Sequence, residues 1–234
     1  MSALGPAAAA APPPLALFDL DGTLLAGDTD VLWCEFLIDA GILERETFAA
    51  ANRSVADRYQ RGEIAPAEFA AFYAATLAGR SADEWAPIRD RFVATAIAPR
   101  LGAASLELVG RHREAGDRLV LTTATNRFLT EPIAARLGIA DLIATDLEVG
   151  VSGEFTGRLS GTVNMREGKV ARLAAWLVAN GLDVSSLAAA TCYSDSINDL
   201  PLLSAVGHAV VVDPDPRLRA EALRRRWPVI SLRG

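Results

Sequence analysis

The apolar positions follow two different spacings in the N-terminal half of the chain. Residues 15–20 form an apolar run that only Asp19 interrupts, and Asp21 and Gly22 close it. A short apolar run that ends in a turn is typical of a buried parallel strand. Residues 29–98 are rich in alanine, with aromatic side chains at helical spacing and no convincing strand pattern. The pattern therefore predicts one strand followed by a helical insert.

Strand and helix patterns alternate along the rest of the chain. Helices are predicted at about residues 103–115, 128–137, 165–179, 200–205 and 218–226, and strands at residues 118–121, 142–144, 188–193 and 209–212. Such alternation predicts a parallel sheet with crossover helices. Residues 149–161 combine glycines at turn-like intervals with alternating apolar positions, which favours a hairpin that forms a small flap.

These patterns predict an α/β fold, a doubly wound, Rossmann-like parallel sheet that a helical cap interrupts early. We assign residues 15–26 and 99–234 to the core domain and residues 27–98 to the cap domain. Residues 1–14 lack the basic start of a secretory signal. We expect them to form a disordered leader. No later apolar run reaches the roughly 20 residues of a membrane span.

Composition and charge narrow the class of partner. The 234 residues include 23 Lys and Arg against 29 Asp and Glu, which gives a net charge of −6. This balance provides no electrostatic footprint for nucleic acid or an anionic membrane, so a small-molecule substrate is expected. Cys34 and Cys192 lie far apart without metal-ligand spacing, which indicates neither a disulfide framework nor a zinc site. We therefore expect a soluble cytoplasmic protein, and the sequence leaves its oligomeric state open.

Polar residues follow three of the predicted strands. Asp19 and Asp21 follow the first, a Thr-Thr-Ala-Thr run at residues 122–125 follows the second, and Ser-Asp-Ser-Ile-Asn-Asp at residues 194–199 follows a later one. Ligands bind beyond the carboxyl ends of the strands in open parallel sheets, so these clusters are expected to form one site. Lys169, on a predicted helix, is the cation that joins them.

The chemistry of this set favours phosphoryl transfer. Asp19 and Asp21, two residues apart on an extended segment, point to the same side, and Asp195 and Asp199 bring the carboxylates to four. Their repulsion requires a hard cation and a lysine if all are to be ionised near neutral pH. Mg²⁺ suits such a set because it takes one or two carboxylates together with waters and substrate phosphate. A carboxylate can then attack phosphorus while metal and lysine neutralise the phosphate oxygens.

Four motifs occur in order along the chain: LFDLDGTL at residues 17–24, VLTTAT at residues 120–125, GKVARL at residues 168–173 and YSDSINDLPLL at residues 193–203. They resemble the four signature motifs of the haloacid dehalogenase superfamily, and more closely those of its phosphoserine-phosphatase-like branch, subfamily IB. The resemblance implies a helical cap of the C1 type just after the first motif, which matches the position of the predicted insert.

The resemblance implies a role for each residue at a motif position. Asp19 is the nucleophile that becomes transiently phosphorylated, and Asp21 protonates the leaving oxygen and then activates water. Mg²⁺ is held by Asp19, Asp195 and the backbone carbonyl of Asp21, while Asp199 completes the acidic shell or orients Lys169. The residues implied to contact the phosphate are Thr123, Ala124, Lys169 and Asn198.

Two positions depart from the family pattern. Ser194 replaces the glycine that usually begins the fourth motif, which leaves the metal ligand unchanged and affects the local backbone geometry. Asp28 stands nine residues after the nucleophile, where the phosphoserine phosphatases resembled here carry a glutamate that holds the substrate's amine. Its shorter side chain weakens the case for phosphoserine, and Asp28 can equally cap the first helix of the insert. Arg58 and Arg61 are candidate ligands for a carboxylate or a second phosphate, although an exposed helix face is the favoured interpretation.

The sequence is compatible with three functions. The first is hydrolysis of a small phosphomonoester by a Mg²⁺-dependent phosphatase; if Asp28 faces an amine, the substrate is an amino-acid or amino-alcohol phosphate such as phosphoserine or histidinol phosphate. The second is transfer of the phosphoryl group to another alcohol, as in phosphotransferases and phosphomutases of the same fold. The third is a catalytically silent binding protein, against which the intact Asp19, Asp21, Lys169 and Asp195 argue. Because a hydrolase must discharge an aspartyl phosphate, a base at Asp21 favours the phosphatase.

Overall fold

The computed structural model describes residues 12–233, so most of the leader predicted for residues 1–14 lies outside the described residues. Within them, a seven-stranded sheet has the order β4-β3-β2-β1-β5-β6-β7. Neighbouring strands are parallel except β3 and β4, which are antiparallel. The strands are β1 (Leu15–Phe18), β2 (Arg118–Asn126), β3 (Asp141–Val149), β4 (Phe155–Ser160), β5 (Thr191–Ser194), β6 (His208–Val212) and β7 (Val229–Ile230). The predicted α/β fold class is confirmed.

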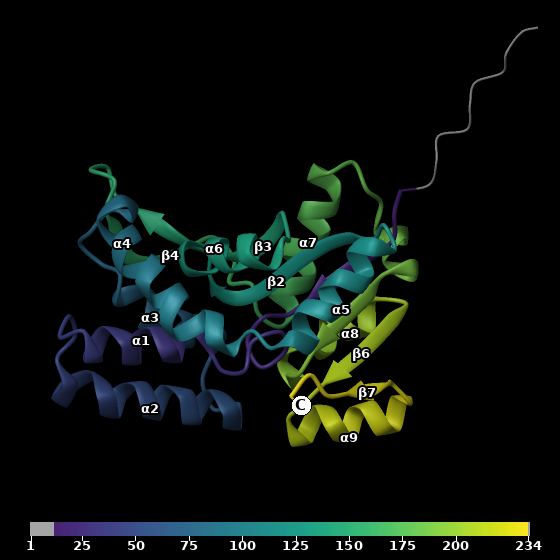
Figure 1. The fold of residues 1–234 in the computed structure, drawn as a ribbon, viewed down its shortest axis with the longest axis horizontal. Helices are drawn as coiled ribbons and strands as arrows, with labels where there is room; N and C mark the ends of the chain where they lie inside the picture. The colour runs from purple at the N-terminus through teal and green to yellow at the C-terminus, as the bar shows by residue number, and fades with distance from the viewer. Residues whose placement is uncertain (1–11, 234) are drawn as a thin grey trace, which may run out of the picture.

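Helices cover both faces of the sheet (Figure 1). α5 (Ala103–Glu114) and α6 (Arg127–Leu137) pack on one face, and α7 (Glu167–Ala179), α8 (Leu200–Ala205) and α9 (Pro216–Arg225) pack on the other. Successive side chains of β1 alternate between these two layers: Ala16 and Phe18 belong to the first apolar core, and Leu15 and Leu17 to the second. A strand that is apolar on both faces therefore sits at the centre of the sheet.

Four α-helices lie between β1 and α5, in the segment where the sequence predicts a helical insert. They are α1 (Thr29–Asp39), α2 (Arg45–Arg61), α3 (Pro66–Ala75) and α4 (Ala82–Phe92), and a π-helical turn at Val93–Ile97 and a 3₁₀ turn at Ala98–Arg100 lead back to the core. Local signals set their ends: Ser81 and Glu84 form a capping box at the start of α4, and Gly62 ends α2 in the left-handed conformation. Figure 1 shows these helices beside the sheet, with the C-terminal end of α2 close to α9.

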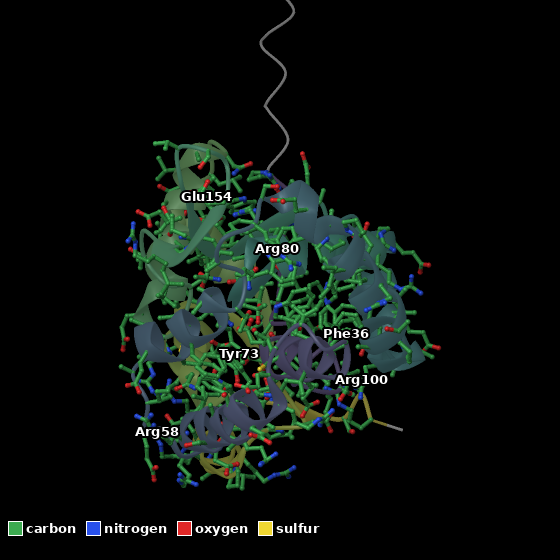
Figure 2. The ribbon with its side chains drawn as sticks, turned by 90° about the vertical axis from the view of Figure 1, so that its left-hand side faces the viewer. Phe36, Arg58, Tyr73, Arg80, Arg100 and Glu154 are labelled. Carbon is green, nitrogen blue, oxygen red and sulfur yellow. The ribbon has the colours of Figure 1, made fainter. Side chains whose placement is uncertain are left out.

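The hairpin formed by β3 and β4 ties the insert to the core. The N–H of Gly79 donates to the carbonyl oxygen of Phe155, and the N–H of Phe155 donates to the carbonyl oxygen of Arg80, both at 2.9 Å. Figure 2 shows Arg80 on the insert and Glu154 on the hairpin. Residues 149–161 supply the turn and second strand of the predicted hairpin, whereas its first strand is the end of β3. The outer edge of β4 is therefore covered by the insert.

The insert has an apolar core of its own that reaches over the carboxyl edge of the sheet. Its buried members are Cys34, Ile38, Ile64, Phe69 and Tyr73, joined by Met165 from the loop before α7. Asn52 is buried among them; its amide donates to the carbonyl oxygen of Val31 at 3.1 Å and accepts from Tyr73 Oη at 2.9 Å. These contacts fix which face of α2 turns inward.

Strand boundaries differ most from the sequence prediction. β2 and β3 run several residues past the predicted ends at Leu121 and Ala144. β2 continues through polar residues into the site, and the added residues of β3 pair with β4. The strand predicted at residues 188–193 begins at Thr191, since Val184–Ala189 forms a 3₁₀ helix. The two-residue edge strand β7 is not predicted at all. None of the helices that the structure describes has both the length and the apolar character needed to cross a membrane.

Candidate active site

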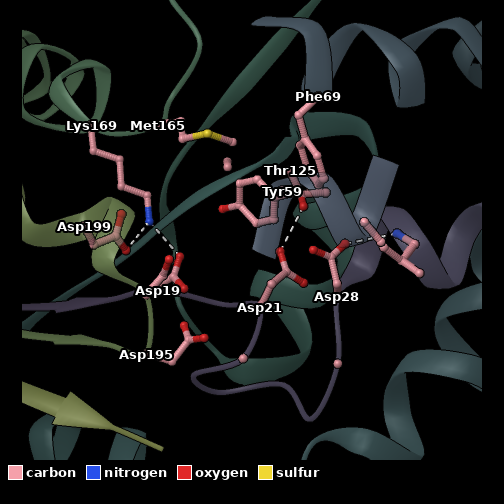
Figure 3. A pocket seen from close by; sticks show the side chains of 16 residues that line it. Asp19, Asp21, Asp28, Tyr59, Phe69, Thr125, Met165, Lys169, Asp195 and Asp199 are labelled. Carbon is pink, nitrogen blue, oxygen red and sulfur yellow. Dashed lines mark hydrogen bonds and ion pairs between the residues drawn. The ribbon is translucent and has the colours of Figure 1, made fainter. Parts of the chain in front are cut away.

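The carboxyl ends of β2, β1 and β5 meet at the centre of the sheet, where the strand order reverses around β1. Open α/β sheets bind ligands at such a switch point. Asp19 directly follows β1 and Asp195 directly follows β5, and the N–H of Asp19 donates to the carbonyl oxygen of Tyr193 at 3.0 Å. A cavity of about 310 Å³ opens beyond these strand ends (Figure 3). The topology thus brings together the clusters that the sequence predicts to form one site.

Lys169 is the only lysine among the 23 Lys and Arg residues of the chain. α7 carries it into the site, where its Nζ lies 2.7 Å from Asp19 Oδ1 and 2.7 Å from Asp199 Oδ2 (Figure 3). Ser194 Oγ also donates to Asp199 Oδ2, at 2.8 Å. The serine that replaces the usual glycine therefore adds a hydrogen bond to Asp199, and Lys169 lies between Asp199 and Asp19.

Thr23 and Gly22 position the second strand-end carboxylate. Thr23 Oγ1 donates to Asp195 Oδ1 at 2.9 Å, accepts from the N–H of Asp195 at 3.0 Å and lies 3.3 Å from Asp19 Oδ2. Gly22 has a φ of +76°, and a Cβ there would lie 2.1 Å from Asp195 Oδ2. Glycine is therefore required both for the backbone turn and for the close approach of Asp195 to the chain that follows β1.

Asp21 is held by donors from two elements. Its Oδ1 accepts from the N–H of Thr29 at 2.7 Å and from the Thr29 hydroxyl. Its Oδ2 accepts from Thr125 Oγ1 at 2.9 Å and from Thr123 Oγ1 at 3.3 Å. Both oxygens of Asp21 are thus fixed by groups at the start of α1 and the end of β2. Asp21 nevertheless lines the cavity beside Asp19.

Burial dominates the charge balance of the site. It raises the pKa of Asp19 to about 7; Lys169 opposes this rise, and Asp199 adds to it. Burial also raises the pKa of Asp21 against its hydrogen bonds, and burial together with Asp19 raises the pKa of Asp195 well above its ordinary value. For Lys169, burial favours the neutral amine, but Asp19 and Asp199 outweigh it and raise the pKa of the lysine. The carboxylates therefore outnumber the positive charge available to them.

A divalent cation fits this imbalance. Among the described residues, no group of three or more His, Cys, Asp or Glu side chains is arranged as a complete metal site. The donors at the strand ends are the carboxylates of Asp19 and Asp195, with the backbone carbonyl of Asp21 between them in sequence. Mg²⁺ takes one or two carboxylates and completes its octahedron with water and substrate phosphate, whereas Ca²⁺ needs a larger set of oxygens. The donor chemistry thus fits Mg²⁺.

Asp28 is both a helix cap and a wall of the cavity. Its Oδ1 accepts from the N–H of Val31 at 3.0 Å and so caps α1, and its side chain faces the cavity near Asp21 (Figure 3). Burial and the nearby Asp21 raise the pKa of Asp28 to about 7. The two roles considered for Asp28 from the sequence are therefore compatible.

The structure places the other predicted residues at different distances from the cavity. Ala124 lines it, whereas Thr123 lies behind Asp21 and Asn198 accepts from Arg166 Nε at 3.0 Å. Arg58 pairs with Glu68 at 2.8 Å and Arg61 with Glu63 at 2.9 Å, and neither arginine lines the cavity. Figure 2 shows Arg58 on the outer side of the insert. The arginines therefore follow the exposed-face interpretation.

Sequence reasoning missed most of the residues that the insert contributes. Val31, Ala56, Tyr59 and Phe69 line the cavity, together with Met165. Thr29 was also missed as a donor to Asp21, although its place directly after Asp28 is a signal that a helix begins there. Lys169 was predicted to belong to the site, and its being the only lysine of the chain is a further sign in the sequence that it has a specific role.

Residues 16–204 match the family model of haloacid dehalogenase-like hydrolases. A histidinol-phosphatase of Neisseria meningitidis serogroup C is 38% identical over 219 residues, which cover 94% of this chain and 99% of that protein. A phosphoserine phosphatase of Mycobacterium tuberculosis is 33% identical over 228 residues, which cover 93% of this chain and 70% of that protein. The chain belongs to the haloacid dehalogenase-like hydrolase family, and it is a phosphatase.

Solved structures share the fold. A Bordetella pertussis Tohama I protein of unknown function aligns with a TM-score of 0.88 at 42% identity, over 94% of this chain and 99% of that one. A phospho-aspartyl intermediate analogue of phosphoserine phosphatase aligns with a TM-score of 0.67 at 17% identity, over 96% of this chain and 95% of that one. At that identity the second likeness is one of fold.

Proposed function

We propose that the chain hydrolyses a small phosphomonoester through a phosphorylated Asp19. The observation that carries this proposal is the arrangement around Asp19, which has Lys169 Nζ at 2.7 Å, Asp195 beside it and Asp21 on the same cavity wall. This arrangement supports attack by Asp19 on phosphorus. Lys169 neutralises charge on the phosphoryl oxygens, and Asp21 can protonate the leaving oxygen.

Each step has a residue to perform it. An oxygen of Asp19 attacks phosphorus as the bond to the substrate's ester oxygen breaks, and Asp21 gives its proton to that oxygen, so the alcohol leaves neutral. Asp21 then takes a proton from water as the water attacks the aspartyl phosphate, which releases inorganic phosphate and restores Asp19. Thr29 and Thr125 keep Asp21 in place for both steps.

The proposal includes Mg²⁺, which phosphatases of this family generally use. Asp19, Asp195 and the backbone carbonyl of Asp21 would hold it, and when bound it supplies positive charge to the phosphate oxygens. Asp199 orients Lys169, and we place Ala124 and Lys169 against the phosphate. Thr123 and Asn198 then act from behind these groups, through their contacts with Asp21 and Arg166.

The substrate of the proposed reaction is a small phosphorylated metabolite with an amine. Asp28 on the cavity wall supports the amine, and residues 27–98 supply a cap, because Val31, Ala56 and Tyr59 complete the cavity from α1 and α2. The net charge of −6 supports a small molecule over a nucleic acid. Two buried free cysteines support a reducing compartment, and we place the enzyme in the cytoplasm.

Hydrolysis of p-nitrophenyl phosphate with Mg²⁺ tests the reaction. We expect Asp19→Asn to abolish both turnover and covalent labelling by radioactive phosphate, because the amide is not a nucleophile. Asp21→Asn should still be labelled by this activated ester but should release phosphate slowly. Asp39→Asn, an exposed carboxylate paired with Arg45, is the matched control. Turnover that survives in Asp19→Asn would contradict the proposal, and phosphate transfer to an added alcohol in place of water would indicate a phosphotransferase.

A further inference from the structure

The far end of the cavity, away from Lys169 and Asp195, differs chemically from the end that holds the phosphate. Apart from Asp28, its lining side chains are apolar or aromatic: Val31, Ala56, Tyr59 and Phe69, whereas the apolar Met165 lies nearer Lys169 (Figure 3). The rings of Tyr59 and Phe69 stack with their centroids 4.2 Å apart, so Tyr59 is held as a firm wall (Figure 3). This end offers one anionic group against a largely apolar surface.

Positive charge is scarce throughout the cavity. Of the described residues that line it, five are aspartates and Lys169 is the one cation. The ammonium of Lys169 is already shared between Asp19 and Asp199. Neither of two nearby arginines lines the cavity: Arg58 pairs with Glu68 on the outer face of α2, and Arg166 Nε donates to Asn198.

Resting on the proposed function, we propose that this cavity selects phosphomonoesters of amino alcohols, which carry an ammonium and an apolar or ring-bearing group but no carboxylate, over phosphorylated amino acids. A substrate carboxylate would enter a space lined by aspartates and would find no cation to pair with it. An ammonium in the same space is attracted by those aspartates.

Asp28 is placed to receive the ammonium. Its Oδ1 accepts from the N–H of Val31, which fixes the carboxylate, and the side chain lines the cavity. Behind it, the buried Asp30 has no hydrogen-bond partner for Oδ1 within the described part of the chain, and its Oδ2 lies 3.3 Å from Thr125 Oγ1. Burial raises the pKa of Asp30 well above its ordinary value, so Asp28 is the acidic group on the cavity wall that can pair with an ammonium.

The orientation of α2 explains why the wall is apolar. Asn52, Ala56 and Tyr59 share one helix face at i, i+4 and i+7, and the buried hydrogen bonds of Asn52 hold that face inward. Arg58 lies off this face. Position 56 is therefore the place in α2 where a longer side chain would enter the cavity.

Substrate pairs that differ in one group test the selectivity of the wild-type enzyme. Phosphoethanolamine and L-phosphoserine share the amine and differ by a carboxylate, and we expect kcat/KM to be at least about tenfold higher for phosphoethanolamine. We expect 2-amino-3-phenylpropyl phosphate to exceed both phosphoethanolamine, which lacks the ring, and 3-phenylpropyl phosphate, which lacks the amine, by about tenfold each. Equal or better hydrolysis of phosphoserine would overturn the inference.

Two variants locate the selectivity. Asp28→Asn should collapse the advantage of 2-amino-3-phenylpropyl phosphate over 3-phenylpropyl phosphate toward unity. Ala56→Arg should raise kcat/KM for phosphoserine relative to phosphoethanolamine by about tenfold, whereas the neutral Ala56→Gln should not. Ratios unchanged in both Asp28→Asn and Ala56→Arg would overturn the assignment. Activity on p-nitrophenyl phosphate that depends on Asp19 separates these outcomes from failure of the proposed function, because the aryl ester carries neither amine nor carboxylate.

Discussion

The backbone N–H of Thr29 donates to Asp21 Oδ1 at 2.7 Å. Thr29 is the first residue of α1, so the helical insert begins at the carboxylate that the proposed reaction uses as acid and base. The same turn carries Asp28, which faces the amine end of the cavity. One short segment therefore connects the proposed acid and base to the carboxylate that we propose binds the substrate's amine.

Thr29→Val should impair the reaction without disturbing the fold. Valine has the shape of threonine and keeps the backbone N–H, but it removes the hydroxyl that also donates to Asp21. Because that hydrogen bond favours the carboxylate, its loss raises the pKa of Asp21 and shifts the acidic limb of the kcat profile to higher pH. We expect kcat to fall about tenfold.

The control for Thr29→Val is Thr130→Val. Thr130 is equally buried, and its hydroxyl donates to the carbonyl oxygen of Asn126 within the start of α6. A kcat profile that moves as much in Thr130→Val as in Thr29→Val would show that the effect is general to buried threonines.

Lys169→Met should lower both the free energy of unfolding and the catalytic activity. The lysine is 2% exposed, and its removal leaves Asp19 and Asp199 buried without a cation. Breaking a buried ion pair from one side typically costs about 3–5 kcal/mol, which urea denaturation can measure. The double variant Lys169→Met with Asp199→Asn should recover part of this stability but none of the activity. A double variant no more stable than the single one would argue against the charge explanation.

Lys169 should resist acylation in the folded protein. It is the only lysine in the chain, so mass spectrometry after acetic anhydride treatment assigns lysine modification to one position. Burial blocks the reagent, and the raised pKa keeps the amine protonated and unreactive. We expect modification at Lys169 to be strong in urea and nearly absent without it, and equal modification in both conditions would exclude the buried ion pair.

Mg²⁺ should raise the thermal stability of the wild-type protein. A ligand that binds only the folded state stabilises it by about 2.7 kcal/mol at 100 times its Kd. Asp195→Asn should lose most of this shift, because it removes one of the two carboxylates proposed to hold the ion. Asp39→Asn should keep the shift, and a similar shift in both variants would place the bound Mg²⁺ elsewhere.

The stability of the metal-free enzyme should fall between about pH 4 and pH 7 in part because of Asp19. Burial raises the pKa of Asp19 from 3.8 to about 7, so the folded state keeps a proton that the unfolded state releases in this window. This contribution is complete below the lower pKa and is lost as pH rises through the upper one. Asp19→Asn should lose less stability over the same window, measured by denaturation in chelator. Parallel pH profiles for the two proteins would contradict the raised pKa.

The sequence by itself determined the sheet and its catalytic edge. Apolar runs that end in Asp19 and Asp195 mark the carboxyl ends of buried strands, and in a parallel sheet those ends meet regardless of what lies between them. The alternation of strands and helices likewise predicts the layers of the core. Strand ends were less accurate, because β2 and β3 continue through polar residues such as Thr123 and Thr145 that pair with their neighbours in the sheet.

Only the tertiary structure decided what the insert presents to the substrate. α2 is amphipathic, with Phe48, Val55 and Tyr59 on one face, but this local pattern does not show which part of the protein that face contacts. The orientation of α2 comes from the buried hydrogen bonds of Asn52 and the stacking of Tyr59 on Phe69, both between segments distant in sequence. Helix propensity fixes where a helix forms, whereas packing against other elements fixes its rotation. The reaction could therefore be inferred from the strand ends, and the chemistry of the substrate pocket could not.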